Sequence, residues 1–222
     1  MGRIREDECE WPGHSKDMNV VIVDYGVGNL SSVQNMLRKA GVNAAISSDP
    51  GQILDAGKIL LPGVGSFDHA MKMLNESGLR EALDRFALEL RRPVLGICLG
   101  AQILGKSSEE GCIPGLSWID MTCKRLPDAP GLRVPHMGWS QVELKRRAPL
   151  FDAAAPDSRY YFVHAYYMQC ADASDVLGTS VHGIEFASVV QRGAIFGTQF
   201  HPEKSLRHGL AVMRGFAEYQ PQ

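Results

Sequence analysis

The sequence predicts one α/β domain with a parallel central sheet and antiparallel strands added in the C-terminal half. In the N-terminal half, short apolar runs alternate with segments of helical periodicity, which implies right-handed crossovers and parallel strands. In the C-terminal half, strand-like runs follow one another between Gly and Pro residues, and helix signals are weak. A length of 222 residues fits one such domain better than two.

The predicted strands of the N-terminal half are short apolar runs, and the first of these runs is rich in β-branched residues. NVVIVD, the first of them, is typical of a strand covered on both faces. We expect strands over residues 19–24, 42–46, 59–61 and 94–97. We expect helices over residues 30–40, where Gly41 ends the helical spacing, after Ser66, and over residues 79–90.

The predicted strands of the C-terminal half are shorter and bounded by turn residues. They cover residues 118–125, 141–144, 160–170, 188–191 and 194–198, and a last helix covers residues 205–219. Residues 1–17 are polar and contain Pro12 and Gly13, so we expect a disordered leader before a single domain over residues 18–222.

Composition excludes several classes of protein. The net charge of −2 lacks the basic excess of a nucleic-acid-binding surface, so we expect no nucleic-acid partner. Since no apolar run approaches about 18 residues, we expect no membrane span. The five cysteines are irregularly spaced without a CxxC pair, which argues against a disulfide framework or a zinc ribbon. Because residues 1–17 are charged and have no apolar core, we expect no secretory signal there, and we expect a cytoplasmic protein.

Cys98 lies where a buried strand is predicted to turn into a helix. The segment Gly96-Ile97-Cys98-Leu99-Gly100 matches the pattern G-x-nucleophile-x-G, with Cys in place of Ser. A sharp strand-to-helix turn exposes its central side chain, and a helix N-terminus favours a thiolate. The alternative is a buried cysteine that only ends a core strand.

A thiolate nucleophile needs a base, and His201 is the candidate. It follows a predicted strand, and Pro202 restricts it to an extended conformation. In an extended segment residues i and i+2 face the same side, so Glu203 is expected to orient the imidazole. By itself, a His-Pro-Glu segment is more often an ordinary surface turn.

Two glycine-rich loops follow predicted strands. Residues 62–65, PGVG, are expected to lie at the same carboxyl edge of the sheet as Cys98 and to offer backbone N–H donors to an oxyanion or a phosphate. In residues 26–29, GVGN, the dinucleotide fingerprint lacks its third small residue, because Ser31 stands there. A tight turn is the simpler interpretation.

Together these segments resemble the class I triad glutamine amidotransferases, most closely the glutaminase subunits of imidazole glycerol phosphate synthases. The resemblance covers about residues 18–219. It is carried in order by VDYGVGN, LPGVGSFD, GICLGAQ, KSSEEG, PHMGWS, YYFVHAYY and GTQFHPEKS. It implies a flavodoxin-like, three-layer fold with added antiparallel strands.

The resemblance implies a role for each matching residue. Cys98 attacks the side-chain amide of L-glutamine, His201 moves the proton, Glu203 orients His201, and a γ-glutamyl thioester is hydrolysed to glutamate. The expected oxyanion site is the backbone of Val64, Gly65 and Leu99. The expected substrate-binding residues are Gly63, Gln102, Glu110, His164, Ala165 and Tyr166. The alternatives left open are a solvated loop charge for Glu110 and a satisfied core histidine for His164. No cofactor and no metal are implied.

The resemblance also implies a partner, a (β/α)8-barrel cyclase subunit that forms a heterodimer and receives ammonia through its interior. The expected interface residues are Asn29, Met137, Trp139 and Lys204. Gly138 and Ser140 predict a turn-like, exposed segment around Trp139, which could otherwise be a core aromatic residue.

Three departures from the family pattern leave the client pathway open. Ala101 replaces the frequent Met, Ser140 replaces the common Asn, and Ala165 replaces the usual Ser or Thr. The leading hypothesis is ammonia supply for imidazole glycerol phosphate and AICAR in histidine biosynthesis. The alternatives are a paralogue serving amidino-sugar synthesis on surface polysaccharide, a non-catalytic partner scaffold, and a stand-alone hydrolase of γ-glutamyl bonds. PHMGW and HPEKS disfavour the last because they resemble partner-facing motifs.

Overall fold

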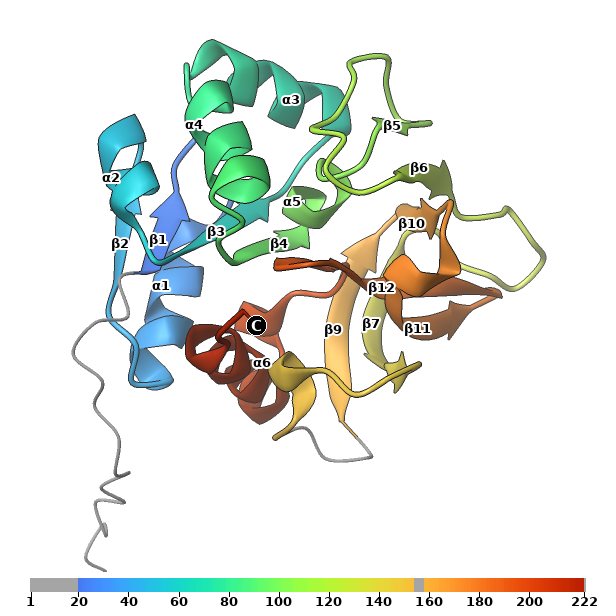
Figure 1. The fold of residues 1–222 in the computed structure, drawn as a ribbon. Helices are drawn as coiled ribbons and strands as arrows, with labels where there is room; N and C mark the ends of the chain where they lie inside the picture. Colours follow the sequence, from blue (N-terminus) through green and yellow to red (C-terminus); the bar gives the residue numbers. More distant parts are fainter. Residues whose placement is uncertain (1–19, 154–157, 222) are drawn as a thin grey trace, which may run out of the picture.

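The computed structural model describes residues 20–153 and 158–221, in which one large sheet is flanked by helices on both faces (Figure 1). The predicted leader and Asn19 of the first predicted strand lie outside these residues. Within the described residues, no helix is long and apolar enough to cross a membrane.

The sheet has a parallel half whose strands are fully buried, except for the partly exposed strand at its edge. These are β1 (Val20–Val23), β2 (Ala44–Ser47), β3 (Lys58–Gly63), β4 (Val94–Cys98) and β13 (Ile195–Thr198). Their spatial order is β2-β1-β3-β4-β13, and every neighbouring pair is parallel. The carboxyl ends of β3, β4 and β13 therefore lie side by side.

Beyond β13 the sheet continues in antiparallel pairs, except for one parallel pair at its far edge. The order continues through β12 (Ile184–Arg192), β10 (Tyr166–Cys170), β6 (Met121–Arg125) and β5 (Ser107–Ser108), while β11 (Val176–His182) pairs with β12 and β8 (Glu143–Leu144). A separate two-stranded sheet pairs β7 (His136–Gln141) with β9 (Arg159–His164). The predicted parallel sheet with antiparallel additions is confirmed.

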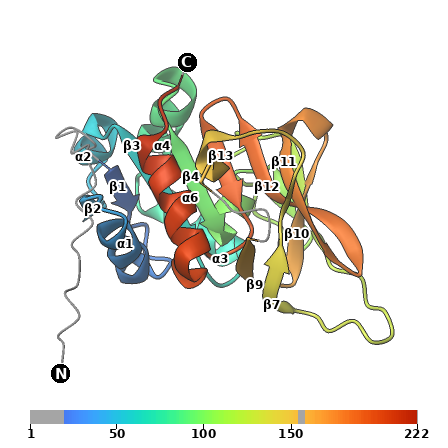
Figure 2. The same ribbon diagram turned by 90° about the horizontal axis from the view of Figure 1, so that it is seen from below.

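Helices cover both faces, which makes the fold three-layered. On one face lie α1 (Leu30–Lys39) and α6 (Leu206–Glu218); on the other lie α2 (Pro50–Asp55), α3 (Phe67–Glu76) and α4 (Arg80–Asp84), whose axis continues in a π-helical turn, Arg85–Glu89 (Figures 1 and 2). A hydrophobic core lies on each face of the sheet, and successive strand residues point into one core and then the other. Ile59 and Leu61 face the α3 side, whereas Leu60 faces the α1 side.

Local signals explain the helix boundaries. Asn29 caps α1 by accepting a hydrogen bond from the Ser32 N–H at 3.2 Å, and Gly41 has the left-handed φ of +82° that ends a helix. Helix α2 was not predicted, although Asp49 caps it and Pro50 occupies its first turn.

The C-terminal half departs more from the predictions. The expected strand over residues 160–170 is two strands, because the chain leaves the small sheet after β9 and joins the main sheet as β10. The strand predicted over 118–125 begins only at Met121, the one over 141–144 is the end of β7 followed by β8, and β11 was not predicted.

Candidate active site

Cys98 ends β4 and precedes the short helix α5 (Leu99–Gln102). Its backbone has φ +54° and ψ −111°, a conformation that a residue with a side chain rarely adopts. The strained turn holds the thiol at the carboxyl edge of the sheet, where Cys98 is buried but lines a pocket. The predicted strand-to-helix elbow is confirmed.

The glycines of the GICLG motif make this elbow sterically possible. A Cβ added to Gly100 would lie 1.7 Å from the Leu61 carbonyl oxygen, and one added to Gly96 would lie 2.6 Å from the Gly100 carbonyl oxygen. Gly63, paired with Cys98 in the sheet, would bring a Cβ to 2.5 Å from the Gly100 nitrogen. The turn therefore packs directly on β3, and Gly63 supports the elbow from beneath.

His201 approaches Cys98 from the end of β13. Its Nδ1 lies 2.7 Å from Glu203 Oε1, and both side chains are buried. The predicted contact is present, but its predicted cause is wrong: Pro202–Lys204 form a 3₁₀ turn rather than an extended segment. The Ser205 hydroxyl holds this turn by donating to the His201 carbonyl at 2.6 Å and accepting from the Tyr161 N–H at 2.9 Å.

The electrostatics of the pair favour a proton on His201. Burial alone lowers the pKa of this imidazole, but its hydrogen bonds to Cys98 and Glu203 and their negative charges outweigh burial and raise the pKa to about 9. The second oxygen of Glu203 is buried without a hydrogen-bond partner in the described structure. A cysteine sulfur beside a stabilised imidazolium is the arrangement of an activated thiol nucleophile.

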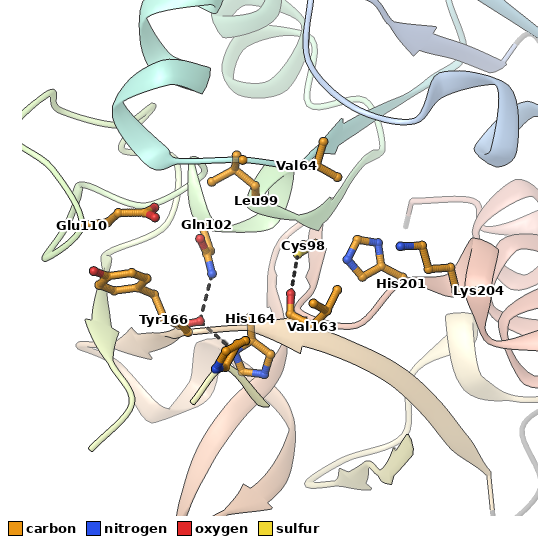
Figure 3. A pocket seen from close by; sticks show the side chains of 13 residues that line it. Val64, Cys98, Leu99, Gln102, Glu110, Val163, His164, Tyr166, His201 and Lys204 are labelled. Atoms are coloured by element: carbon orange, nitrogen blue, oxygen red, sulfur yellow. Dashed lines mark hydrogen bonds between the residues drawn. The ribbon is translucent and has the colours of Figure 1, made fainter. Parts of the chain in front are cut away.

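A cavity of about 440 Å³ opens over the Cys98 sulfur (Figure 3). Its walls are Val64, Gly65, Cys98, Leu99, Gln102, Glu110, Pro135, Val163, His164, Ala165, Tyr166, His201 and Lys204. Ten of the twelve residues that the sequence marked as catalytic, oxyanion or substrate residues line it; Gly63 and Glu203 stand directly behind this lining. Pro135 and Val163 were not singled out, although both lie in motifs that were.

The loop after β3 forms one rim of the cavity. Val64 is exposed at this rim. Gly65 has a φ of +99°, and among the described residues no heavy atom lies within 4 Å of a Cβ added there. The Tyr25 hydroxyl, from the loop after β1, donates to the Pro62 carbonyl at 2.8 Å. The loop is therefore anchored at its base and open at its tip, where backbone N–H groups can meet a ligand.

Two polar side chains at the far end of the cavity offer oxygen acceptors. Glu110 lines the cavity and accepts the Phe67 N–H on Oε2 at 2.8 Å, a bond that does not use its other carboxylate oxygen. Gln102 donates both hydrogens of its amide nitrogen, one to the Tyr166 carbonyl and one to Gln199, each at 3.0 Å. Its remaining polar atom is the oxygen, so both residues can accept from a cationic group.

His164 forms the floor and belongs to a buried histidine pair. Its Nδ1 lies 2.8 Å from the Tyr166 carbonyl oxygen, and its Nε2 lies 3.0 Å from His136 Nδ1. His136 Nε2 in turn lies 2.9 Å from the Ser140 hydroxyl. Burial lowers the pKa of His136 to about 4 and of His164 to about 3. Both interpretations of His164 therefore hold, because it is a satisfied core histidine that also lines the cavity.

The predicted partner-facing residues lie outside the cavity, except for Lys204, which lines its mouth. Asn29, Met137, Trp139 and Lys204 are all exposed, with 63% of Met137 and 43% of Trp139 accessible. The segment around Trp139 is a strand and not the predicted turn, so alternation turns Met137 and Trp139 outward together while His136 faces inward. Tyr161 links this surface to Lys204: its ring centroid lies 5.9 Å from that of Trp139 and 5.8 Å from Lys204 Nζ.

Among the described residues, no group of three or more His, Cys, Asp or Glu side chains is arranged to hold a metal ion. The residues around the cavity supply a thiol, an imidazole in contact with a carboxylate, and backbone donors near polar acceptors. Such a set suits acyl transfer from an amide or ester.

Comparisons with known proteins agree with this geometry. Residues 21–217 match the family model described as glutamine amidotransferase class-I. The chain is 45% identical over 199 residues to imidazole glycerol phosphate synthase subunit HisH 2 of Pseudomonas aeruginosa, covering 90% of this chain and 98% of that protein. It is 46% identical over 200 residues to the corresponding HisH subunit of Moorella thermoacetica, covering 90% and 94% of the two chains.

Solved structures show the same fold at low sequence identity. A crystal structure of a glutamine amidotransferase matches with a TM-score of 0.70 at 20% identity, covering 90% of this chain and 98% of that one. A structure of PurLQS from Thermotoga maritima matches with a TM-score of 0.63 at 18% identity, covering 90% and 94%.

Proposed function

This chain belongs to the class-I glutamine amidotransferase family, and from this premise we propose how its cavity hydrolyses glutamine. The protein is the glutaminase subunit of imidazole glycerol phosphate synthase and acts in histidine biosynthesis, as its relatives at 45% and 46% identity over nine-tenths of the chain indicate. The observation that carries the chemistry is the convergence of Cys98, His201 and Glu203 at one cavity.

Hydrolysis proceeds through two acyl transfers at the Cys98 sulfur. The sulfur attacks the side-chain amide carbon of L-glutamine, and the carbonyl oxygen becomes an oxyanion facing the backbone of Val64, Gly65 and Leu99. The His201 imidazolium gives its proton to the departing nitrogen, and the C–N bond breaks to release ammonia and leave a γ-glutamyl thioester. The neutral imidazole then takes a proton from water, which attacks the thioester and releases glutamate and the thiol.

The acceptors at the far end of the cavity orient the substrate. Glu110 and Gln102 present oxygens to the α-ammonium group of glutamine, because the Gln102 amide hydrogens are already bonded within the protein. His164, Ala165 and Tyr166 form the opposite wall. This orientation directs the side-chain amide toward Cys98.

Free ammonia is protonated in water, so the protein needs a partner that receives it. We assign this role to a (β/α)8-barrel cyclase subunit docked over the cavity mouth in a heterodimer, which converts a phosphoribulosyl aminoimidazole-carboxamide nucleotide to imidazole glycerol phosphate and AICAR. The exposed apolar side chains Met137 and Trp139 and the cation Lys204 at that mouth support this docking surface. The site of action is the cytoplasm.

The direct test is glutamate release from glutamine by the purified full chain, alone and with the histidine-pathway cyclase subunit plus its nucleotide ligand. We expect strong stimulation by that partner. Hydrolysis without stimulation, together with stimulation by a barrel subunit from a surface-sugar pathway, would reassign the client to amidino-sugar synthesis. No hydrolysis with either partner would refute the glutaminase mechanism and favour a non-catalytic scaffold.

A further inference from the structure

Gln199 is a buried polar residue to which the sequence analysis gave no role. It lies two residues before His201, directly after β13, and its exposed fraction is 0%. It does not line the cavity. Its amide nitrogen lies 3.8 Å from Cys98 Sγ, and its amide oxygen accepts from Gln102 at 3.0 Å.

The orientation of the Gln199 amide follows from a backbone carbonyl. The Tyr166 carbonyl can only accept hydrogen bonds, so the Gln102 atom at 3.0 Å from it must be the amide nitrogen (Figure 3). The same nitrogen faces Gln199, so the Gln199 atom that meets it must be the oxygen. The nitrogen of Gln199 is therefore the atom left to face the sulfur.

The Tyr166 carbonyl oxygen accepts hydrogen bonds from two chains of residues, or arms. One arm runs through Gln102 to Gln199, and the second runs through the histidine pair. The Nδ1 of His164 lies 2.8 Å from the Tyr166 oxygen and must donate to it, which makes the Nε2 an acceptor for the Nδ1–H of His136. His136 is then an acceptor for the Ser140 hydroxyl. Each step in this arm has one allowed direction, so a Tyr166 carbonyl that turned away from Gln102 would also lose its hydrogen bond from His164.

The other atoms around the sulfur make this donor significant. The Val163 carbonyl oxygen lies 3.9 Å from Cys98 Sγ, where it accepts from the neutral thiol but faces an anion unfavourably (Figure 3). The Gln199 N–H opposes that effect, because a donor favours the charged form of the group to which it donates. We propose that Gln199 is a positioning residue whose fixed N–H donor stabilises the Cys98 thiolate before glutamine is attacked.

This inference rests on the proposed function, but its test measures the reactivity of the Cys98 thiol directly. The full chain without partner is alkylated with iodoacetamide across a pH series, and mass spectrometry quantifies the peptide that contains Cys98. The variants are Gln199→Met, which keeps the side-chain length and removes the donor, and Gln199→Leu, in case the first variant does not fold. Exposed Cys112 in the same molecule is the internal reference.

The matched control is Ser188→Ala. Ser188 is as buried as Gln199, and its carbonyl accepts the backbone N–H of Gln199 at 2.8 Å. Its hydroxyl accepts from the Ser180 hydroxyl and lies outside the two arms. This variant tests whether any lost buried polar group near Gln199 gives the same result.

We expect the alkylation midpoint of Cys98 to rise by about one pH unit in Gln199→Met, the size expected for one hydrogen bond to a charged group. The midpoint of Cys112 and that of Cys98 in Ser188→Ala should stay unchanged. With the partner present, kcat/KM for glutamine should fall most at low pH and recover as pH rises, whereas a merely structural role lowers it equally at every pH.

An unchanged Cys98 midpoint in a folded Gln199 variant would overturn the inference, as would an equal shift in Ser188→Ala. Failure of the proposed function is distinguishable, because it shows as absent glutamate release by the wild-type chain whatever the alkylation result.

Discussion

At the scale of single residues, the site depends on where one proton resides. His201 is buried, which disfavours its charged form, yet the sulfur of Cys98 and the carboxylate of Glu203 raise its pKa to about 9. Near neutral pH the imidazole therefore carries a proton, which is the one that the proposed mechanism gives to the leaving ammonia. The contact of 2.7 Å between Nδ1 and Glu203 Oε1 fixes the ring so that its other nitrogen serves the sulfur and the substrate.

Replacing this carboxylate should impair both the charge and the orientation of His201. In Glu203→Gln we expect the His201 pKa to fall below its wild-type value, because one of the contributions that raise it is lost. We expect kcat for glutamine to fall by about a hundredfold, within the range of general acid–base catalysis. NMR titration of the His201 ring and steady-state kinetics with the partner measure the two effects.

The matched control for this variant is Glu218→Gln, a charge change at the end of α6 that should leave both values unchanged. An unaltered His201 titration in Glu203→Gln, with kcat within about twofold of wild type, would contradict the assigned role of the carboxylate.

At the scale of elements, the elbow exists because β3, β4 and α5 touch backbone to backbone. Gly100 has no room for a side chain, since its Cβ would lie 1.7 Å from the Leu61 carbonyl oxygen. The contact is with backbone in a buried strand, which cannot move aside as a flexible side chain would. The positive φ of Cys98 is maintained only by this packing.

Gly100→Ala should therefore destabilise the protein by about 3 kcal/mol or more, at the upper end of overpacking costs. Urea denaturation measures the change. The control is Gly51→Ala in α2, an exposed helical position where an added Cβ meets only the Asp49 side chain at 3.1 Å. Its cost should stay below about 1 kcal/mol. A Gly100→Ala protein as stable as wild type would refute the steric account of the elbow.

The buried histidine pair joins β7 to β9 and predicts loss of stability in acid. Burial holds the pKa of His136 at about 4 and of His164 at about 3, whereas an unfolded histidine titrates near about 6.5. Between these values the unfolded chain binds more protons, so stability falls as pH falls below about 6.5. His201 does not oppose this effect. The stability that its raised pKa contributes is fully present below about pH 6.5 and is lost only as pH rises toward about 9.

We expect the free energy of unfolding to be about 2–4 kcal/mol lower at about pH 5 than at about pH 7. His136→Gln, which cannot titrate, should reduce this pH dependence by about half, whereas His69→Gln on the exposed face of α3 should leave it intact. Equal urea midpoints for the wild-type protein at both pH values would show that the pair is not held neutral.

Several elements were predictable because one local signal determined them. The four short apolar runs specified β1 to β4 and the parallel half of the sheet, and the spacing of Leu30, Val33 and Leu37 specified α1. The break between β9 and β10 was not predictable, because Val163 to Tyr167 remains strand-like in sequence while the chain changes sheets. That change depends on partners distant in sequence.

The candidate site was predictable where a residue's role follows from its own motif. The elbow at Cys98 and the contact of Glu203 with His201 were expected, although the second arises from a 3₁₀ turn. Gln199 and the His136–His164 pair were not expected. Their significance lies in atoms brought together from different strands, and no spacing in the sequence carries that information.

At the scale of the whole molecule, the cavity lies where two kinds of sheet meet. The parallel half supplies the Cys98 elbow, the Val64 loop and the start of the His201 segment from adjacent strand ends. The antiparallel half and the small sheet supply the wall from Val163 to Tyr166 (Figures 1 and 3). The same small sheet turns Met137 and Trp139 outward beside the cavity mouth, which places the proposed docking surface next to the nucleophile.

The central claim is that Cys98 generates the ammonia which the partner consumes. The most direct measurement compares wild type and Cys98→Ala in the complex with the cyclase subunit, following glutamate release and formation of imidazole glycerol phosphate from glutamine or from added ammonium. We predict that Cys98→Ala loses both glutamine-dependent activities while synthesis from ammonium persists. Glutamine hydrolysis by Cys98→Ala at the wild-type rate would contradict the account.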